Sequence, residues 1–267
     1  MGFLTGKKFL ITGISSNRSI AYGIAKACAR EGAELALSYN NERFKERVQG
    51  FADEFGAGQV IKLDASSDES IDLAALELAN RWTDGFDGFV HSIGWAPRES
   101  ISGSFLEGAS REGFLSAMNV SVYSYIAMAK RMVPLMAGHK ASLLTLSYLG
   151  GEKVVPNYNT MGLCKAALES ATAILLLRRP QGIRANTLSC GPIKTLAASG
   201  IKGFSSMLAQ CKAVSPTRSL VSIDEVGNTA AFLLSDNSLG ITAETIYIDG
   251  GFNALACCVD QTASENA

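Results

Sequence analysis

The sequence has few histidines, no marked excess of charge and no long hydrophobic run. Two histidines and six cysteines without metal-ligand spacing argue against a zinc site and against a histidine-based catalytic triad. A net charge of −1, with no run of five like charges, does not suggest a nucleic-acid partner or an anionic membrane surface. No apolar run reaches the roughly 18 residues of a membrane-spanning helix. We therefore expect no metal site, no nucleic-acid partner and no membrane partner.

The composition is that of a globular protein with a sizeable core. Hydrophobic residues make up 47% of the 267 residues and charged residues 18%. The N-terminal stretch "MGFLTGKKFLITG" enters a strand-like run directly, so it is not expected to be a signal peptide. Cysteines scattered in this way favour reduced thiols and a cytoplasmic location.

Apolar runs alternate with helix-like stretches along the whole chain. Strands are predicted at 7–12, 34–39, 59–64, 86–94, 142–148, 183–192 and 244–251. Helices are predicted at 19–33, 42–55, 68–82 with Asp68 as N-cap, 111–136, around 158–165, and 223–234. Strands this apolar are typical of a parallel sheet covered on both faces. The sequence thus predicts an α/β fold with a doubly wound, Rossmann-like parallel sheet, as a single domain over residues 1–256 followed by a tail at 257–267.

The turn after the first strand is a candidate phosphate-binding loop. In "TGISSNRSIAYG", Gly13 supplies a tight turn, while Ser15, Ser16 and Ser19 supply hydroxyls and a helix cap. The usual G-x-G-x-x-G pattern is absent. An ordinary strand-to-helix turn explains this stretch equally well.

Three further strand ends favour a dinucleotide. The second strand ends in "NNE" at 40–42, where neutral and acidic side chains suit the ribose hydroxyl of NADH better than the 2′-phosphate of NADPH. The third ends at Asp64, which can accept a hydrogen bond from an adenine amino group or cap the next helix. The fourth ends at Gly94, which lets a ribose approach or simply makes a turn. Because these strand ends share one edge of the sheet, a dinucleotide site is favoured.

The stretch "PNYNTMGLCKAALE", at 156–169, places a tyrosine and a lysine on one predicted helix. Seven residues turn through about 700°, so Tyr158 and Lys165 would share a face about 10.5 Å apart along the axis. That is too far for most direct hydrogen bonds, but a cofactor ribose can lie between them. The lysine charge would favour a more acidic phenol, and a tyrosine can protonate a developing enolate. A chance pair on a surface helix is the alternative.

One family combines the motifs found here, which are "GISSNRSIAYGIAKA", "HSIGWAP", "LLTLSYLGGEKVVPNYNTMGLCKAALE", "GPIKTLAASGIKGF" and "VGNTAAFLLSD". From Met1 to about Phe252 the chain resembles the enoyl-acyl-carrier-protein reductases of bacterial type II fatty acid synthesis, divergent members of the short-chain dehydrogenase/reductase superfamily. The tyrosine–x6–lysine spacing with an upstream "SYLG" is specific. Ordinary superfamily members use tyrosine–x3–lysine with a catalytic serine.

The resemblance implies hydride transfer from NADH to the β-carbon of a trans-2-enoyl thioester, the last reductive step of fatty acid elongation. Tyr158 would be the proton donor, Tyr148 a second tyrosine near the substrate, and Lys165 the residue that holds the nicotinamide ribose. The matching cofactor positions are Gly13, Ser19, Ile20, Asn40, Asp64, Ala65, Ile93, Gly94, Lys165, Ile193, Lys194, Thr195, Leu196 and Ala197. The matching substrate positions are Ala96, Tyr148, Tyr158, Met161, Ile201 and Phe204.

The resemblance also implies acyl carrier protein as partner and a homotetrameric assembly. The chain departs from the family pattern at several positions, which are Asn40, Ala65, Trp95, Cys190, Ser205 and Ser206. The two serines stand where relatives carry basic residues and leave Lys202 as the nearby cation, so we expect weaker or differently placed docking of the acidic carrier.

Two other functions stay open at this point. The first is another enzyme of the superfamily, such as a ketoacyl reductase, against which the spacing of Tyr158 and Lys165 argues. The second is a catalytically silent nucleotide-binding relative, which would have no need to keep both residues. Fold alone decides neither.

Overall fold

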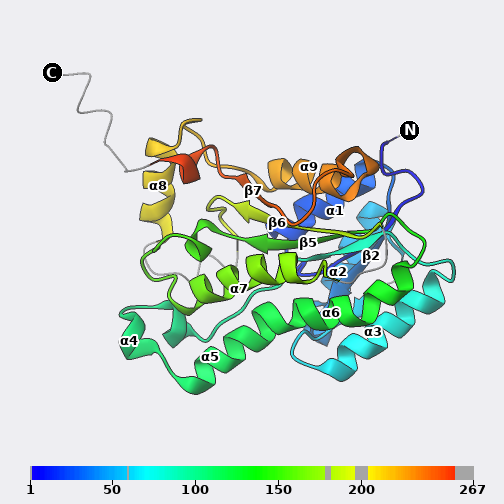
Figure 1. The fold of residues 1–267 in the computed structure, drawn as a ribbon, viewed down its shortest axis with the longest axis horizontal. Helices are drawn as coiled ribbons and strands as arrows, with labels where there is room; N and C mark the ends of the chain where they lie inside the picture. The colour runs from blue at the N-terminus through cyan, green and yellow to red at the C-terminus, as the bar shows by residue number, and fades with distance from the viewer. Residues whose placement is uncertain (1, 59, 178–181, 196–203, 256–267) are drawn as a thin grey trace.

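A computed structural model describes residues 2–58, 60–177, 182–195 and 204–255 (Figure 1). The strands are β1 Lys8–Ile11, β2 Glu34–Tyr39, β3 Ile61–Lys62, β4 Gly88–His91, β5 Ser142–Ser147, β6 Arg184–Cys190 and β7 Thr245–Ile248. They form one parallel sheet in the order β3-β2-β1-β4-β5-β6-β7. The predicted doubly wound, Rossmann-like sheet is confirmed.

Helices cover both faces of this sheet. The α-helices are α1 Ile20–Arg30, α2 Lys45–Phe55, α3 Asp68–Arg81, α4 Phe105–Gly108, α5 Arg111–Met118, α6 Ser124–Met132, α7 Thr160–Ile174, α8 Phe204–Val214 and α9 Ile223–Leu234. Figure 1 shows α1 and α9 above the sheet, with α3, α6 and α7 below it. Within the described part of the chain, no helix has both the length and the apolar character needed to cross a membrane.

The sheet separates two hydrophobic cores. Side chains alternate along β1, so that Leu10 packs into one core while Phe9 and Ile11 pack into the other. The first core lies against α3, α6 and α7, and the second against α1, α2 and α9. Burial on both faces is the physical reason that the strands read as continuous apolar runs.

The predicted helix at 111–136 is interrupted. Between α5 and α6 lies a π-helical turn, η3, at Asn119–Tyr123. The Ser124 hydroxyl donates to the carbonyl oxygen of Val120 at 2.7 Å, and so binds the backbone within this turn. Turns of this kind frequently mark functional sites, and here the turn carries Ser121 to the loop that follows β4.

The expectation that Tyr158 and Lys165 share one helix is wrong. Helix α7 begins at Thr160, and Tyr158 lies in the turn before it. The flanking residues Asn157 and Asn159 have φ angles of 65° and 41°. Asparagine tolerates this left-handed region better than most residues, so the two asparagines end the helix on its N-terminal side.

Two smaller differences concern the N-cap of α3 and the two helices that were not predicted, α4 and α8. The N-cap of α3 is Ser67, whose hydroxyl accepts from the Ser70 amide at 3.2 Å, and Asp68 is the first helical residue instead. Helix α8 was not predicted. Only Phe204 and Cys211, two turns apart, are buried on it, so its apolar periodicity is weak.

Candidate active site

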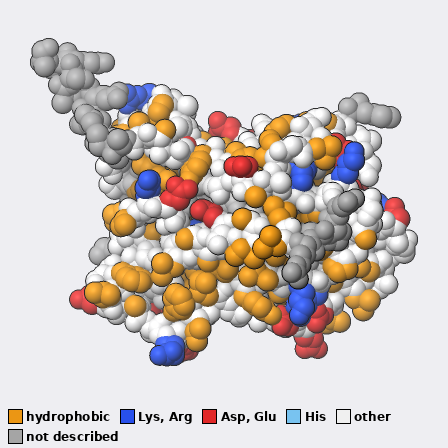
Figure 2. Space-filling view, viewed as in Figure 1, with side chains coloured by type: hydrophobic (Ala, Val, Ile, Leu, Met, Phe, Trp, Pro, Cys, Tyr) orange, Lys and Arg blue, Asp and Glu red, His pale blue; other side chains and the backbone are white. Residues whose placement is uncertain are grey.

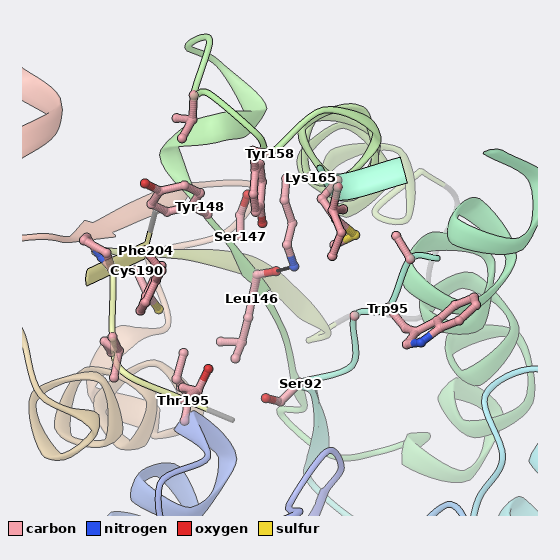
Figure 3. Close-up of a pocket in the computed structure, with 18 of the residues that line it drawn as sticks. Ser92, Trp95, Leu146, Ser147, Tyr148, Tyr158, Lys165, Cys190, Thr195 and Phe204 are labelled. Atoms are coloured by element: carbon pink, nitrogen blue, oxygen red, sulfur yellow. Dashed lines mark hydrogen bonds between the residues drawn. The ribbon is translucent and has the colours of Figure 1, made fainter. Parts of the chain in front are cut away.

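A cavity of about 770 Å³ opens at the carboxyl ends of β1, β4, β5 and β6 (Figure 3). The strand order reverses between β1 and β4, which is where open α/β sheets bind their ligands. Its walls come from the loop after β1, the segment after β4, the end of β5, the start of α7, the segment after β6, and α8. The fold therefore brings together the loop after β1, the end of β4, the stretch 148–165 and the described start of the segment after β6, but not the ends of β2 and β3 or the stretch on α9.

The loop after β1 is held close to the end of β4. Gly13 has a φ of 85°, and a Cβ at this position would lie 1.9 Å from the carbonyl oxygen of Ser92. The Thr12 hydroxyl donates to the Val90 carbonyl at 2.9 Å and accepts from the Ser92 amide at 3.3 Å. Only glycine fits here, because a side chain would overlap the end of β4. We call the loop from Gly13 to Ser19, at the start of α1, the Gly13 cradle.

Replacing Gly13 by alanine is expected to lower the free energy of unfolding by about 2 kcal/mol or more and to weaken nucleotide binding. The left-handed backbone costs a non-glycine residue about 1–2 kcal/mol, and the overlap with Ser92 adds to this. Chemical denaturation and NADH titration measure the two effects. Gly240→Ala is the matched control, because nothing lies within 4 Å of a Cβ there. Equal unfolding midpoints for both variants would contradict the expectation.

Ser19 closes the loop rather than capping α1. It occupies the N-cap position without a side-chain capping bond. Its hydroxyl instead accepts from the amides of Ser15 and Ser16, each at 3.1 Å. Ser19 therefore does not provide the predicted side-chain cap of α1. The loop amides are bound to Ser19, and the N-terminus of α1 faces the cavity through Ile20.

Lys165 lies buried on the cavity wall. Its ammonium donates to the carbonyl oxygen of Leu146, at the end of β5, at 2.7 Å. A Cβ on Gly94 would lie 3.7 Å from Nζ, so the ammonium sits between the ends of β4 and β5. Burial lowers the pKa of Lys165 to about 8.

Tyr148 and Tyr158 pack against each other beside Lys165 (Figure 3). Their ring centroids are 5.0 Å apart in an edge-to-face arrangement. A Cβ on Gly150 would lie 2.5 Å from Cδ1 of Tyr158, so the glycine makes room for the pair. The Tyr148 hydroxyl contacts the Met207 sulfur of α8 at 3.6 Å.

Both phenols are neutral at neutral pH and can donate a hydrogen bond. Burial raises the pKa of Tyr158, and burial raises the pKa of Tyr148 to about 12. The Tyr158 phenol is therefore less acidic than a free phenol, because removal from water dominates its pKa. The expected acidifying effect of the Lys165 charge stays a prediction.

The carboxylate of Glu169, next to this wall, was not predicted as a site residue. Glu169 lies one helical turn after Lys165 and accepts a hydrogen bond from the Ser147 hydroxyl. Burial raises the pKa of Glu169. Together with the bond from Lys165 to Leu146, this contact ties α7 to the end of β5. The four-residue spacing from Lys165 was the only signal in the sequence.

The ring of His91, the last residue of β4, is buried and contacts two hydroxyl groups. Its Nε2 lies 2.8 Å from the Ser124 hydroxyl and its Nδ1 3.0 Å from the Thr145 hydroxyl. Because Ser124 donates to Val120, it accepts from His91, which assigns the proton to Nε2. Burial, followed by the charge of Lys165, lowers the pKa of His91 to about 3, so the ring is neutral.

Most predicted site residues that the structure describes line the cavity. These are Gly13, Ser19, Ile20, Ile93, Gly94, Ala96, Tyr148, Tyr158, Met161, Lys165, Ile193, Thr195 and Phe204. Other cavity residues were not predicted as site residues, including Trp95, Arg98, Cys190 and Met207. Burial raises the pKa of Cys190 to about 12, so its thiol is neutral.

Four predicted residues lie away from the cavity lining. Asn40 and Lys194 are exposed, and Ala65 packs in the core beside α3. The Asp64 carboxylate accepts from the amide and hydroxyl of Ser66, at 2.9 and 2.7 Å, and so does not cap α3. Leu196, Ala197, Ile201, Lys202 and the tail at 257–267 lie outside the described residues.

The described residues do not include a cluster of three or more histidine, cysteine, aspartate or glutamate side chains that could hold a metal ion. The polar groups that reach the cavity are instead hydroxyls, backbone groups, Arg98 and Lys165. Such a set suits an organic ligand with phosphate and hydroxyl groups.

Comparison with known proteins places the chain in a family. Residues 13–253 match the family described as Enoyl-(Acyl carrier protein) reductase. The NADH-dependent enoyl-acyl-carrier-protein reductase of Salmonella typhimurium is 52% identical over 257 residues, which are 96% of this chain and 97% of that protein.

Two solved structures share the fold over almost the whole chain. The enoyl-acyl-carrier-protein reductase (NADH) of Aquifex aeolicus has a TM-score of 0.92 at 44% identity, covering 96% of this chain and 100% of its own. The enzyme of Anaplasma phagocytophilum, in complex with NAD, has a TM-score of 0.90 at 40% identity, covering 96% and 97%. The chain belongs to the enoyl-acyl-carrier-protein reductase family.

Proposed function

We propose that the chain is an NADH-dependent enoyl-acyl-carrier-protein reductase. It reduces the carbon–carbon double bond of trans-2-enoyl thioesters in the last reductive step of fatty acid elongation. The observation that carries this function is the pair of neutral tyrosines, Tyr148 and Tyr158, packed beside buried Lys165 at the nucleotide edge of the sheet. A ketoacyl reductase needs no such second tyrosine.

The residues present fit a nicotinamide dinucleotide. The Gly13 cradle lines the cavity at the N-terminus of α1 and suits a pyrophosphate, and the ammonium of Lys165 beside Gly94 suits ribose hydroxyls. Bound NADH supplies the hydride that reduces the β-carbon of the substrate. Contacts to the pyrophosphate and nicotinamide are assigned to Ser19, Ile20, Ile93, Ile193, Lys194, Thr195, Leu196 and Ala197. Contacts to the adenosine are assigned to Asn40, Asp64 and Ala65.

Tyr158 stabilises the substrate as negative charge develops on the thioester oxygen. Its neutral hydroxyl donates a hydrogen bond to that oxygen and then transfers its proton to the enolate, which becomes the saturated thioester, and the resulting Tyr158 phenolate regains a proton from water. The edge-to-face contact with Tyr148 holds the phenol in place. The acyl chain is assigned to the apolar wall formed by Ala96, Met161, Ile201 and Phe204.

The test follows absorbance at the NADH band with purified protein and a trans-2-enoyl thioester. We expect NADH to be consumed, and NADPH to be consumed more slowly. Binding of NADH without turnover of any thioester would make the chain a silent relative. Reduction of a ketoacyl thioester in place of the enoyl thioester would make it a ketoacyl reductase.

Three further proposals concern the partner, the domain organisation and the cellular location. Acyl carrier protein is the proposed carrier of the substrate. The continuous sheet from β1 to β7 supports a single domain over residues 1–256. The scattered spacing of the cysteines supports a reducing, cytoplasmic location.

We propose in addition that four copies of the chain assemble. Figure 2 shows hydrophobic side chains gathered over the lower half of the face that carries α5 and α7. The exposed apolar residues on α5, η3, α6 and α7 are Phe114, Leu115, Tyr123, Ile126, Leu163 and Ile174. Exposed apolar side chains in this number on neighbouring helices are typical of a subunit interface.

Light scattering on the purified protein is expected to give four times the 28.2 kDa chain mass. Ile126→Glu is expected to lower that mass, because a charge is costly in an apolar interface. Leu73→Glu, at another exposed apolar residue, on α3, serves as the control and should keep the assembly. A monomer in the wild type, or an unchanged mass in Ile126→Glu, would contradict this interface.

A further inference from the structure

We infer that Arg98, with Trp95, binds the phosphate of the phosphopantetheine arm that carries the acyl thioester. The inference rests on the proposed function, because the substrate must be a thioester on such an arm. It concerns the rim of the cavity, by which we mean the exposed lining residues Trp95 and Arg98. The tyrosines and Lys165 lie on the cavity wall.

Arg98 is available to an anion. Of the cavity-lining residues that the structure describes, Lys165 and Arg98 are the two with a positive charge. Lys165 is buried and bonded to Leu146, whereas Arg98 is exposed. Within the described ranges its guanidinium makes no hydrogen bond or ion pair, and the neighbouring acid, Glu99, does not pair with it. A guanidinium in this state favours bidentate contact with a phosphate.

The rim is held in position by the π-helical turn. The buried hydroxyl of Ser121 accepts from the Trp95 amide at 2.9 Å and donates to the Trp95 carbonyl at 2.8 Å. Arg98 then begins the short 3-10 helix η2, Arg98–Ile101, in which the Ser100 amide donates to the Pro97 carbonyl at 3.0 Å. Because the backbone is already fixed, little ordering is needed when a ligand binds.

Trp95 extends the rim with a flat apolar surface. Trp95 keeps 50% of its surface exposed to solvent although it lines the cavity. Figure 3 shows it across the cavity from Tyr148 and Phe204. The uncharged amide and dimethyl portion of a pantetheine arm can lie on the indole, with the thioester directed towards Tyr158 and the phosphate left at Arg98.

Other anions fit this rim less well. The acyl chain is uncharged and suits the apolar wall. The dinucleotide phosphates suit the cradle at Gly13 and the start of α1, which belong to the loop after β1 and not to the segment that carries Arg98. The phosphate of the arm is therefore the anion that the bound substrate brings to the mouth of the cavity.

The experiment compares two thioesters with the same trans-2-enoyl group, one on phosphopantetheine and one on pantetheine without the phosphate. The quantity measured is the ratio of kcat/KM for the phosphorylated thioester to that for the unphosphorylated one, with NADH in excess. In Arg98→Met we expect this ratio to fall about threefold to tenfold, as for one partly exposed charged pair, chiefly through KM. Arg98→Lys is expected to recover part of the loss, since it keeps the charge without the planar fork.

Arg111→Met is the matched control, because Arg111 is exposed nearby at the start of α5 and does not line the cavity. An unchanged ratio in Arg98→Met, or an equal fall in Arg111→Met, overturns the inference while the reductase function stands. If neither thioester is reduced by the wild type, the proposed function fails and the inference fails with it. A ratio that falls in Arg98→Met alone supports both.

Discussion

Tyr158→Phe is expected to lower kcat on a trans-2-enoyl thioester by about 10²-fold or more, the lower end of what a general acid contributes. The hydroxyl is lost while the ring, and its edge-to-face contact with Tyr148 at 5.0 Å, is kept. Affinity for NADH should change by less than about twofold, because Lys165 and the Gly13 cradle are untouched. Steady-state kinetics and a separate NADH titration distinguish the two quantities.

Two other tyrosines serve as comparisons for this variant. Tyr148→Phe should have a smaller effect, because its hydroxyl contacts Met207. Tyr22→Phe removes a hydroxyl bonded to Glu54, away from the cavity, and should leave kcat unchanged. If Tyr158→Phe kept kcat within about threefold of the wild type, Tyr158 would not be the proton donor, and Tyr148 would be the next candidate.

Lys165→Met is expected to weaken NADH binding by about 10- to 100-fold. Charge-assisted hydrogen bonds contribute about 1.5–3 kcal/mol each, and the methionine can make none to a ribose. The substitution also removes the bond to the Leu146 carbonyl, so part of the loss comes from a less ordered wall. Fluorescence titration with NADH measures the dissociation constant.

The same lysine gives NADH binding a pH dependence in the wild type. Burial lowers the pKa of Lys165 to about 8, so the ammonium loses its proton as pH rises through this value. Affinity for NADH should therefore fall between about pH 7 and pH 9. The effect on folding has the opposite sign. The unfolded chain binds more protons between pH 8 and the usual lysine pKa of 10.5, so this group's cost to stability is relieved as pH rises.

Lys165→Arg is the control for the pH effect, because arginine keeps its charge throughout this range. Whatever its absolute affinity for NADH, this variant should show no change in affinity between pH 7 and pH 9. A wild-type affinity that is flat across the range would show that the bound lysine is neutral or that another group holds the ribose. Lys130→Met, on exposed α6 surface, controls for the loss of one positive charge.

The strand and helix pattern of the sequence was sufficient to predict the architecture. Runs such as "FLI" in β1 are apolar because one side chain enters each core in alternation, and that property is visible without coordinates. The interruption of the helix at 111–136 was not predicted. At the π-helical turn Asn119–Tyr123, Ser124 bonds to Val120 and to His91 on β4, and a contact with a distant strand has no local sequence pattern.

The candidate catalytic residues were likewise found from spacing and resemblance, although the geometry assumed for them was wrong. A shared helix was predicted for Tyr158 and Lys165, but two asparagines with positive φ place Tyr158 in a turn. The two side chains still line one cavity, because the turn and the first part of α7 face the same strand ends. Their assigned roles stay a prediction for the two variants above to test.

The sequence alone determined the fold class through its local periodicity, and its resemblance to a known family indicated the candidate tyrosines and lysine. Only the tertiary structure decided the direction of the pKa shifts at the site and the position of Arg98 at the cavity rim. The pKa directions of Tyr158, Lys165 and Glu169 follow from burial, which arises when α7 packs on the end of β5. Arg98 has a place at the cavity mouth because Ser121, on a distant helical turn, holds the Trp95 backbone. Burial and long-range hydrogen bonds join residues far apart in the chain, and a linear sequence does not display them.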